Sequence, residues 1–265
     1  MSRRQPTIRP IEQIEELEQA VTVLCRVWAA KTPVDLINAS TLWAMAEADN
    51  YVVGLFMVDE DGAEPDEMVG AAVAIRGRKH LHSHIVGVLP GMQGLGLGSL
   101  LKRHEADWAA GEGFEVIRWT FDPLVRRNAH FNLAKLHARV EKYQDNLYGS
   151  LDDGLNDGDE TDRLVIEWDF RADPPADDPA PVVTPGSPDR WDVTGRPEAV
   201  VFLDDGVHCL IPTPPDIEAL RKDDRDRDLA KAWRFGVRAG FSKAEANGYA
   251  VTGFSPDGWY VLRRR

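Results

Sequence analysis

The sequence predicts an α+β protein, because hairpin signals and amphipathic helical repeats occur together along one chain. Apolar runs at residues 51–58 and 68–75 flank an acidic, glycine-containing turn, as the two strands of a hairpin do. Apolar residues recur at helical spacing between Ile14 and Trp28. A chain of 265 residues can form one large domain, or a domain and a smaller module.

Up to residue 170 the predicted elements follow in the order strand, two helices, three strands, helix, strand, helix, strand. The first strand ends near Pro10, and an amphipathic helix follows it. The later elements are a helix within 33–48, strands at 51–58, 68–75 and 80–88, a helix at 99–110, a strand at 114–121, a helix at 128–140 and a strand at 163–170.

A proline-rich stretch divides the chain. Six prolines lie between Arg171 and Asp192 without apolar periodicity, which is typical of an extended linker. We therefore predict a domain at 1–172, a linker at 173–193 and a C-terminal α+β module at 194–265. The module should contain a hairpin at 200–211, a short helix opened by Thr213-Pro214-Pro215, a longer helix at 229–244 and a second hairpin at 249–262.

Composition excludes several classes of protein. The net charge of −13 argues against nonspecific binding of nucleic acid, which requires a basic face. No apolar run approaches the roughly 20 residues of a membrane span, and the N-terminus lacks the apolar core of a signal peptide. The two cysteines, Cys25 and Cys209, lie among apolar residues and are interpreted as free thiols, so a cytoplasmic location is expected. No set of metal ligands is visible.

A glycine-rich stretch between a predicted strand and a predicted helix is the strongest functional signal. Gly91, Gly94, Gly96 and Gly98 fall within eight residues. At a strand-to-helix junction several backbone N–H groups are unpaired, and the helix dipole adds partial positive charge. Glycine removes the side chains that would block an anion, so the stretch predicts a phosphate-binding loop.

Other glycine motifs fit less well. A nucleotide P-loop requires G-x-x-x-x-G-K-[ST], but Gly94 and Gly98 are four residues apart and no lysine precedes Ser99. A dinucleotide fingerprint requires a third glycine where Ser99 stands, early in a βαβ unit. A turn without any ligand is the remaining alternative.

The stretch QGLGLG, residues 93–98, matches the Q/R-x-x-G-x-G/A signature of the GNAT acyltransferases. The stretches RVWAA and HSHIVGVLPGMQGLGLGSLLK are also similar to this family. Residues 119–149 and the stretch DRLVIEWDF are similar to a subgroup of predicted acetyltransferases, and the stretches IPTPPDIEALRKDD and AWRFGVRAGFSKAEANGYAVTGF resemble the C-terminal extension of that subgroup. The resemblance implies the GNAT fold, a mixed and mostly antiparallel central sheet flanked by helices, with a C-terminal α+β extension.

The resemblance also implies a binding site for acyl-coenzyme A. Backbone N–H groups of the loop would hold the pyrophosphate, the pantetheine arm would pair with the backbone near Val86 and Val88, and Asn128 would bond near the thiol end. The loop positions carried over from the family are Gln93, Gly94, Leu95, Gly96, Leu97, Gly98 and Ser99.

The predicted strand at 80–88 offers histidines for acid–base chemistry. His80, His82 and His84 should share one face, because side chains alternate along a strand. His84 is the candidate general base and His82 a second candidate, and the alternative is that both are structural. Many GNAT enzymes carry a tyrosine acid on the fourth helix, but no tyrosine stands at that spacing here. Four alternatives remain open for protonation of the leaving thiolate. Tyr143 folds back to the site, His137 donates the proton, water donates it, or no acid is needed.

The resemblance implies acyl transfer from acetyl-coenzyme A directly to the amine of a small molecule, with an amino acid as one candidate. Succinyl is an alternative acyl group. The other class left open is a noncatalytic acyl-coenzyme A binding or sensing module. The C-terminal module either caps the acceptor site or forms the interface of a homodimer.

Overall fold

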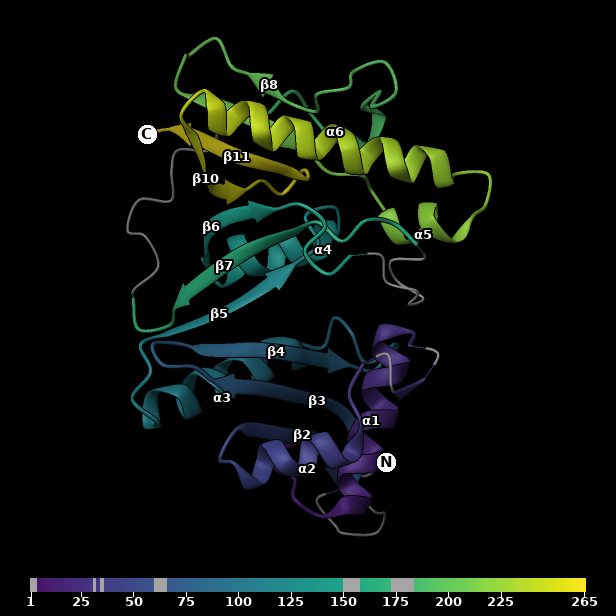
Figure 1. The fold of residues 1–265 in the computed structure, drawn as a ribbon, viewed down its shortest axis with the longest axis vertical. Coiled ribbons are helices and arrows are strands. Elements are labelled where there is room, and N and C mark those ends of the chain that lie inside the picture. The colour runs from purple at the N-terminus through teal and green to yellow at the C-terminus, as the bar shows by residue number, and fades with distance from the viewer. Residues whose placement is uncertain (1–3, 31, 34–35, 60–65, 150–157, 173–183) are drawn as a thin grey trace. The chain divides into compact units, whose positions relative to one another are not determined.

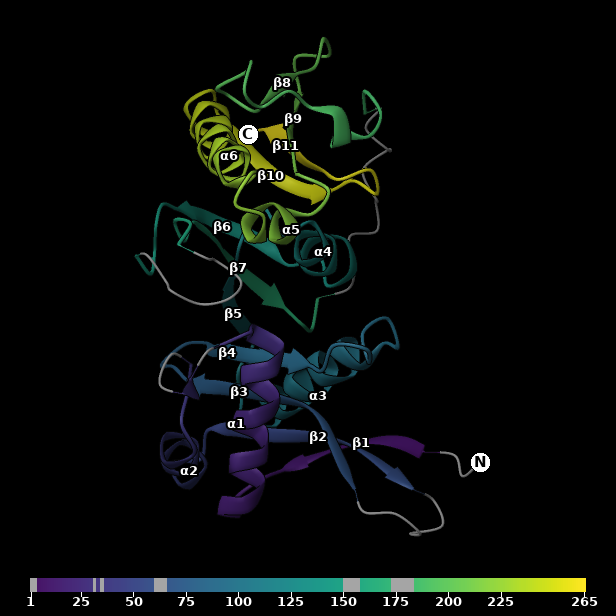
Figure 2. The same ribbon diagram turned by 90° about the vertical axis from the view of Figure 1, so that its right-hand side faces the viewer.

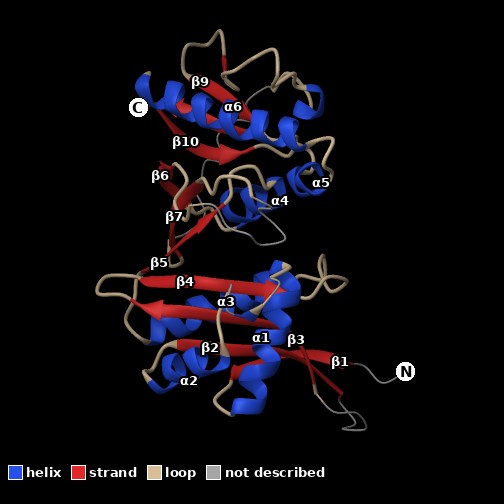
Figure 3. Cartoon of the chain, turned by 45° about the vertical axis from the view of Figure 1, so that its right-hand side comes forward, coloured by secondary structure: helices blue, strands red, loops and turns tan. Residues whose placement is uncertain are grey.

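The computed structural model describes residues 4–30, 32–33, 36–59, 66–149, 158–172 and 184–265. The chain forms two compact units, the N-terminal unit of residues 1–118 and the C-terminal unit of residues 119–265. Figure 3 shows that each of them combines helices with strands. The predicted α+β class is confirmed.

The N-terminal unit is built from antiparallel strands and three helices. Its elements are β1 (Arg4–Pro10), α1 (Ile14–Trp28), α2 (Ala39–Glu47), β2 (Tyr51–Asp59), β3 (Glu67–Arg76), β4 (Leu81–Val88), α3 (Leu97–Gly111) and the start of β5 (Val116–Phe121). Strands β1 to β4 pair antiparallel with their sequence neighbours, whereas β4 and β5 are parallel. The predicted hairpin at 51–75 is therefore confirmed.

Helices cover both faces of these strands. Tyr51 packs against Trp108 of α3 with ring centroids 5.3 Å apart, and its hydroxyl lies 2.8 Å from His104 Nδ1. The next residue, Val52, belongs to the apolar cluster around Leu17 and Leu24 of α1. Neighbouring side chains of a strand point to opposite faces, so α1 and α3 lie on opposite faces. In Figure 1, α3 passes behind β3 and β4, and Figure 2 shows α1 crossing the strands in front.

The C-terminal unit contains the end of β5 and all later elements. These are α4 (Arg126–Ala129), the π-helix η2 (His130–Lys135), β6 (Arg139–Gln144), β7 (Arg163–Asp169), the 3₁₀-helix η3 (Pro188–Arg190), β8 (Val201–Phe202), β9 (His208–Pro212), α5 (Ile217–Lys222), α6 (Arg227–Ala246), β10 (Tyr249–Phe254) and β11 (Trp259–Arg264). Both hairpins predicted here are present, since β8 pairs with β9 and β10 with β11.

The strands form a seven-stranded sheet in the order β1-β2-β3-β4-β5-β7-β6 and a four-stranded sheet in the order β10-β11-β9-β8. Parallel pairing joins β4 to β5, and the pairs β1–β2, β2–β3, β3–β4 and β6–β7 are antiparallel. The expected mixed, mostly antiparallel sheet with a C-terminal α+β extension is thus confirmed.

The helix predicted at 128–140 is wrong in its second half. Helix α4 continues into the π-helix η2, whose end is closed by the hydrogen bond from Ala138 N to Asn132 O at 2.9 Å. His137 then adopts a left-handed φ of 53°, which stops the helix, and the strand β6 follows. Helical spacing of the apolar residues could not show this switch, because a short strand needs few residues to satisfy either period.

Two other boundaries differ from the prediction. Helix α3 begins at Leu97 rather than at residue 99. The cap of α5 is Asp216, whose side chain accepts a hydrogen bond from Ala219 N at 3.0 Å, and not Thr213. Thr213 is buried and donates its hydroxyl hydrogen to Gly258 O at 2.7 Å instead.

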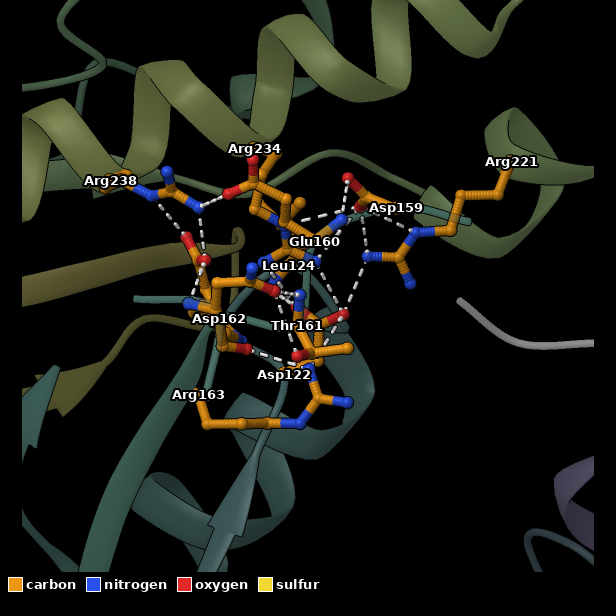
Figure 4. A network of polar contacts seen from close by, with 12 residues as sticks. Asp122, Leu124, Asp159, Glu160, Thr161, Asp162, Arg163, Arg221, Arg234 and Arg238 are labelled. Carbon is orange, nitrogen blue, oxygen red and sulfur yellow. Dashed lines mark hydrogen bonds and ion pairs between the residues drawn. The ribbon is translucent and has the colours of Figure 1, made fainter. Parts of the chain in front are cut away.

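A buried cluster of charges joins distant segments of the C-terminal unit, as Figure 4 shows. Asp122, directly after β5, accepts two parallel hydrogen bonds from the Arg234 guanidinium of α6 at 2.9 and 3.0 Å. Arg221 of α5 bonds the same carboxylate at 2.7 Å and also bonds Asp159. Burial opposes ionisation of Asp122, but the charges of Arg234 and Arg221 outweigh it and lower its pKa.

A second part of the cluster lies around Asp162. Arg238 of α6 bonds both Asp162 and Glu160, and the Tyr143 hydroxyl donates to Asp162 Oδ2 at 2.5 Å. The pairs link α5 and α6 of the extension to the segments next to β5 and β7. The predicted domain limits, 1–172, 173–193 and 194–265, stay a prediction, because a compact unit need not coincide with a family domain. Residues 173–183 of the predicted linker lie outside the described residues.

We expect the substitution Arg234→Met to lower the free energy of unfolding by about 3–5 kcal/mol, because it leaves two buried carboxylates short of their partner. Urea unfolding measures this change. Arg225→Met is the matched control: Arg225 pairs with Asp223 at the surface, so the loss should be at most about 1 kcal/mol. Equal losses for the two variants would show that the buried cluster does not stabilise the unit.

Candidate active site

The glycine loop adopts a backbone that side chains disfavour. Gly91, Gly94 and Gly96 have φ values of 90°, 82° and 79°, in the left-handed region where glycine carries no steric penalty. An added Cβ at any of the three would meet nothing within 4 Å among the described residues. The backbone conformation, and not crowding, therefore requires glycine at these positions.

Gly98 differs from these three glycines. It lies inside the first turn of α3 with an ordinary helical backbone, and a Cβ built on it would also meet nothing within 4 Å in the described structure. Glycine in a helix is less stable than alanine by about 0.5–1 kcal/mol. Neither the fold nor the packing calls for glycine here, but a ligand approaching the backbone would.

The first turn of α3 presents N–H groups without a capping side chain. The N-cap is Gly96, and within the described structure no side chain caps the helix. The first helical hydrogen bond that Gly96 O accepts comes from Leu100 N at 3.0 Å, so the amides of Leu97, Gly98 and Ser99 precede the regular ladder. Such amides, together with the helix dipole, favour an anion.

The residues before that turn are open to solvent. Gln93, Gly94 and Gly96 are exposed, and Leu95 is 65% exposed. The structure thus brings the predicted loop positions together as one accessible surface at the N-terminal end of a 15-residue helix.

Strand β4 contains a β-bulge at His84. The register with β3 pairs Val73 with Ile85 and Ala74 with Ser83, which leaves His84 as the extra residue. Ser83 and Ile85 should share a face under strict alternation. Instead Ser83 accepts a hydrogen bond from Lys102 of α3, and Ile85 packs into the apolar cluster of α1 on the opposite face.

Pairing between β4 and β5 is confined to two residues. The parallel register joins Leu81 to Ile117 and His82 to Arg118, while β4 continues to Val88. Within the described part of the N-terminal unit, the edge of β4 beyond His82 therefore has no β5 partner. Val86 and Val88, the predicted contacts of the pantetheine arm, lie on this half-buried stretch.

His82 and His84 lie next to each other on β4, with ring centroids 6.2 Å apart. Desolvation by the surrounding protein lowers the pKa of both imidazoles, although His84 is exposed and His82 half-buried, and for His82 the neighbouring His84 lowers it further. A lowered pKa leaves the rings neutral at pH 7, the form that can accept a proton. His80 does not belong to this pair: it precedes β4, where its carbonyl accepts a hydrogen bond from Gly77 N at 3.1 Å, so the prediction of three histidines on one strand face is wrong for it.

The remaining predicted site residues belong to the C-terminal unit. Asn128 is half-buried in α4, and its backbone N donates to Val125 O at 2.9 Å. Tyr143 lies on β6 and packs on Phe241, with ring centroids 4.8 Å apart. Burial and the Asp162 charge raise the pKa of Tyr143. Its hydroxyl therefore stays protonated and donates a hydrogen bond to Asp162. The roles of Asn128 and Tyr143 stay predictions.

Sequence reasoning missed one polar group at the site. Beneath β4, Lys102 and Glu105 of α3 are both buried, and their ion pair is 2.8 Å long. Their spacing of three residues along a helix is typical of a surface ion pair, so only the neighbouring apolar pattern of α3 could have indicated that they are buried.

Among the described residues, no group of three or more His, Cys, Asp or Glu could hold a metal ion, and no helix is long and apolar enough to cross a bilayer.

The family comparison agrees with this geometry. Residues 11–136 match the model of the acetyltransferase (GNAT) family. This chain contains a GNAT acetyltransferase domain. The matched stretch includes the glycine loop, the bulged strand β4 and helix α3. The family model describes an acetyltransferase, so the domain is an N-acetyltransferase.

Solved structures are similar to this chain at low identity. The ribosomal-protein-S18-alanine N-acetyltransferase of Escherichia coli is 15% identical with a TM-score of 0.49, covering 65% of this chain and 98% of its own. The yncA protein of Salmonella typhimurium, solved with its cofactor acetyl-CoA, is 19% identical with a TM-score of 0.46, covering 66% of this chain and 99% of its own. The ribosomal-protein-S5-alanine acetyltransferase of Vibrio fischeri is 14% identical with a TM-score of 0.48, covering 64% of this chain and 96% of its own. The comparison with curated proteins gives no match.

We expect Gly98→Ala to weaken acetyl-coenzyme A binding at least tenfold, roughly 1.4 kcal/mol, while leaving the free energy of unfolding equal or higher. Beyond the backbone of its own helical turn and its chain neighbours, the added methyl meets no atom of the described residues within 4 Å, so we expect a collision with the ligand rather than with the protein. Isothermal titration calorimetry and urea unfolding give the two values. Gly111→Ala, at the other end of α3 and equally open, is the control that should bind normally. Normal binding by Gly98→Ala would place the phosphates elsewhere.

Proposed function

We propose that this GNAT domain transfers the acetyl group of acetyl-coenzyme A to the amine of a small molecule, with an amino acid as the first candidate. The observation that carries the proposal is a junction within the N-terminal unit. There, a bulged strand with an unpaired edge leads into a bare glycine loop and an uncapped helix. This junction presents free backbone groups to an extended, phosphate-bearing ligand.

The residues present fit coenzyme A. The amides from Gln93 to Ser99 would hold the pyrophosphate, because every residue of the stretch except Leu97 is exposed or half-buried and no side chain of the described residues caps the helix. The backbone of Val86 and Val88 would pair with the amide groups of the pantetheine arm, as an added strand does at an open sheet edge. Asn128 remains the predicted partner near the thiol end of the arm.

Acetyl-coenzyme A supplies an acetyl group that its thioester activates for attack by an amine. The new C–N bond forms as the C–S bond breaks, the amine loses one proton and the thiolate leaves. In our proposal the backbone at the His84 bulge donates a hydrogen bond to the carbonyl oxygen, where negative charge develops. The His84 imidazole accepts the proton of the amine, either directly or through water, because its lowered pKa keeps it neutral.

His82 takes a supporting part in this scheme. Its ring is adjacent to that of His84 and is also neutral, so it can orient His84 or relay the proton. Tyr143 is retained as a candidate proton donor to the leaving thiolate. Its hydroxyl is protonated but already donates to Asp162, so that role would require exchange of this bond.

The net charge of −13 supports a cationic amine as the acceptor, since it favours encounter with cations. Thiol release from acetyl-coenzyme A should therefore be accelerated by amines in a panel of amino acids, polyamines and peptides with a free N-terminus. Turnover with an amino acid or polyamine supports the proposal, and turnover with the peptides alone overturns the small-molecule acceptor. Binding of acetyl-coenzyme A without turnover by any amine would favour a noncatalytic acyl-coenzyme A binding module. The cytoplasmic location and a homodimer stay predictions.

We expect His84→Gln to lower kcat about 10²–10⁴-fold, because glutamine can form a hydrogen bond but cannot take a proton. His82→Ala should lower kcat by a smaller factor, because His82 lies farther along β4 from the open edge. At saturating amine, the wild-type kcat should rise with pH through an apparent pKa below the ordinary histidine value of 6.5. Stopped assays of thiol release at several pH values measure these changes.

His104→Gln is the control for this experiment, because this histidine belongs to α3 rather than to β4 and its ring contacts Tyr51 of β2. It should keep the wild-type rate and pH profile. A His84→Gln enzyme with full kcat and the same pH profile would rule out His84 as the base.

A further inference from the structure

We infer that Ser83, held by the buried Lys102–Glu105 ion pair of α3, is a positioning residue that fixes the β-bulge at His84. The inference rests on the proposed function, because it concerns the geometry of the same site. It adds three residues that touch neither the acyl donor nor the acceptor but determine where the backbone of the bulge lies.

The contact between strand and helix is short and fully enclosed. Lys102 Nζ donates to Ser83 Oγ at 2.7 Å and to Glu105 Oε2 at 2.8 Å. The exposed fractions are 5% for Ser83, 4% for Lys102 and 0% for Glu105. Charged hydrogen bonds of this kind are stronger than neutral ones, so the ammonium group holds Ser83 firmly on the α3 side of the sheet.

A contribution to the stability of the fold does not readily explain the buried Lys102–Glu105 ion pair. Removing two charges from water is costly, and apolar residues of similar volume are often as stable as a buried ion pair. In addition, Glu105 Oε1 is buried without a hydrogen-bond partner in the described structure. A buried polar group that is not needed for stability can instead serve to select one geometry.

The geometry selected here is that of the bulge. Ser83 directly precedes His84, and Ile85 on its other side is packed against α1. Because these two side chains are anchored on opposite faces, the chain between them must accommodate the reversal at His84. If Ser83 were released from α3, β4 could return to strict alternation, and the backbone amides of the bulge would turn.

The same contact reaches the glycine loop. Lys102 lies in the second turn of α3, and the helix begins at Leu97, next to the predicted phosphate site. One side chain therefore connects the helix that would hold the phosphates to the strand that would hold the reacting carbonyl. This connection fixes the register between the two halves of a single extended ligand.

The test compares Ser83→Ala with Tyr51→Phe. Each removes one hydroxyl that connects a strand to α3, but Tyr51 lies on β2, two strands away from β4, and contacts His104 rather than Lys102. Ser83→Ala should lower kcat for the best amine of the panel at least about tenfold, because small displacements of a reacting group are costly. Its KM for acetyl-coenzyme A should not change. Tyr51→Phe should keep the wild-type kcat.

A readout without any ligand accompanies the kinetics. In Ser83→Ala the backbone amide of Ile85, which pairs with β3 beside the bulge, should exchange hydrogen at least about tenfold faster by NMR, whereas in Tyr51→Phe it should not. Lys102→Met alone would leave Glu105 unpaired in the interior and could unfold the protein. The double variant Lys102→Met/Glu105→Leu removes both charges and should reproduce the Ser83→Ala result.

Wild-type kcat and wild-type exchange in Ser83→Ala would overturn the inference, and so would the same loss in Tyr51→Phe. If the wild-type protein itself acetylates no amine, the proposed function fails, but the exchange measurement still decides whether the Ser83 contact fixes the bulge.

Discussion

The irregular pairing of β4 is the constraint on which the proposed site depends. Antiparallel pairing with β3 proceeds on both sides of one extra residue, His84, and parallel pairing with β5 covers only two residues. A regular strand at this position would satisfy its backbone groups within the sheet. We propose that this edge and the bulge receive the ligand, and that the following glycine loop extends the same surface to the helix α3.

The C-terminal unit is organised by a different interaction. Arg163, Arg221, Arg234 and Arg238 balance Asp122, Asp159, Glu160 and Asp162 in a cluster that connects β5 and β7 to the helices of the extension. Most of these contacts are buried, so losing one partner would leave a charge without compensation. The cluster also holds Tyr143, which accounts for the burial of a residue that sequence comparison offered as a catalytic acid.

Patterns of local periodicity and turn chemistry predicted the fold well. The hairpins, the helices α1, α3 and α6 and the glycine loop all followed from residues that lie close together in the sequence. The failures have physical causes. Alternation along β4 could not reveal a bulge, because the reversal at His84 depends on Lys102 and on α1, which lie elsewhere in the chain. The π-helix and the strand β6 were misread because a short segment satisfies a helical period by chance.

Part of the candidate site could likewise be predicted from the sequence, and part of it could not. The loop residues Gln93–Ser99 could be found from glycine spacing and family resemblance, since the chemistry is that of the backbone. The environment of His84 could not be predicted from the sequence, because its lowered pKa and its place in the bulge depend on tertiary packing. Ser83, Lys102 and Glu105 carry no sequence signal of a site at all.

The most direct test of the account is an NMR titration of the wild-type protein with acetyl-coenzyme A, followed through backbone amide shifts. The account predicts that the largest shifts occur at Gly94–Ser99 and along Ser83–Val88, and that coenzyme A reproduces the changes in the loop. Large shifts confined to other segments, with these amides unchanged, would contradict it.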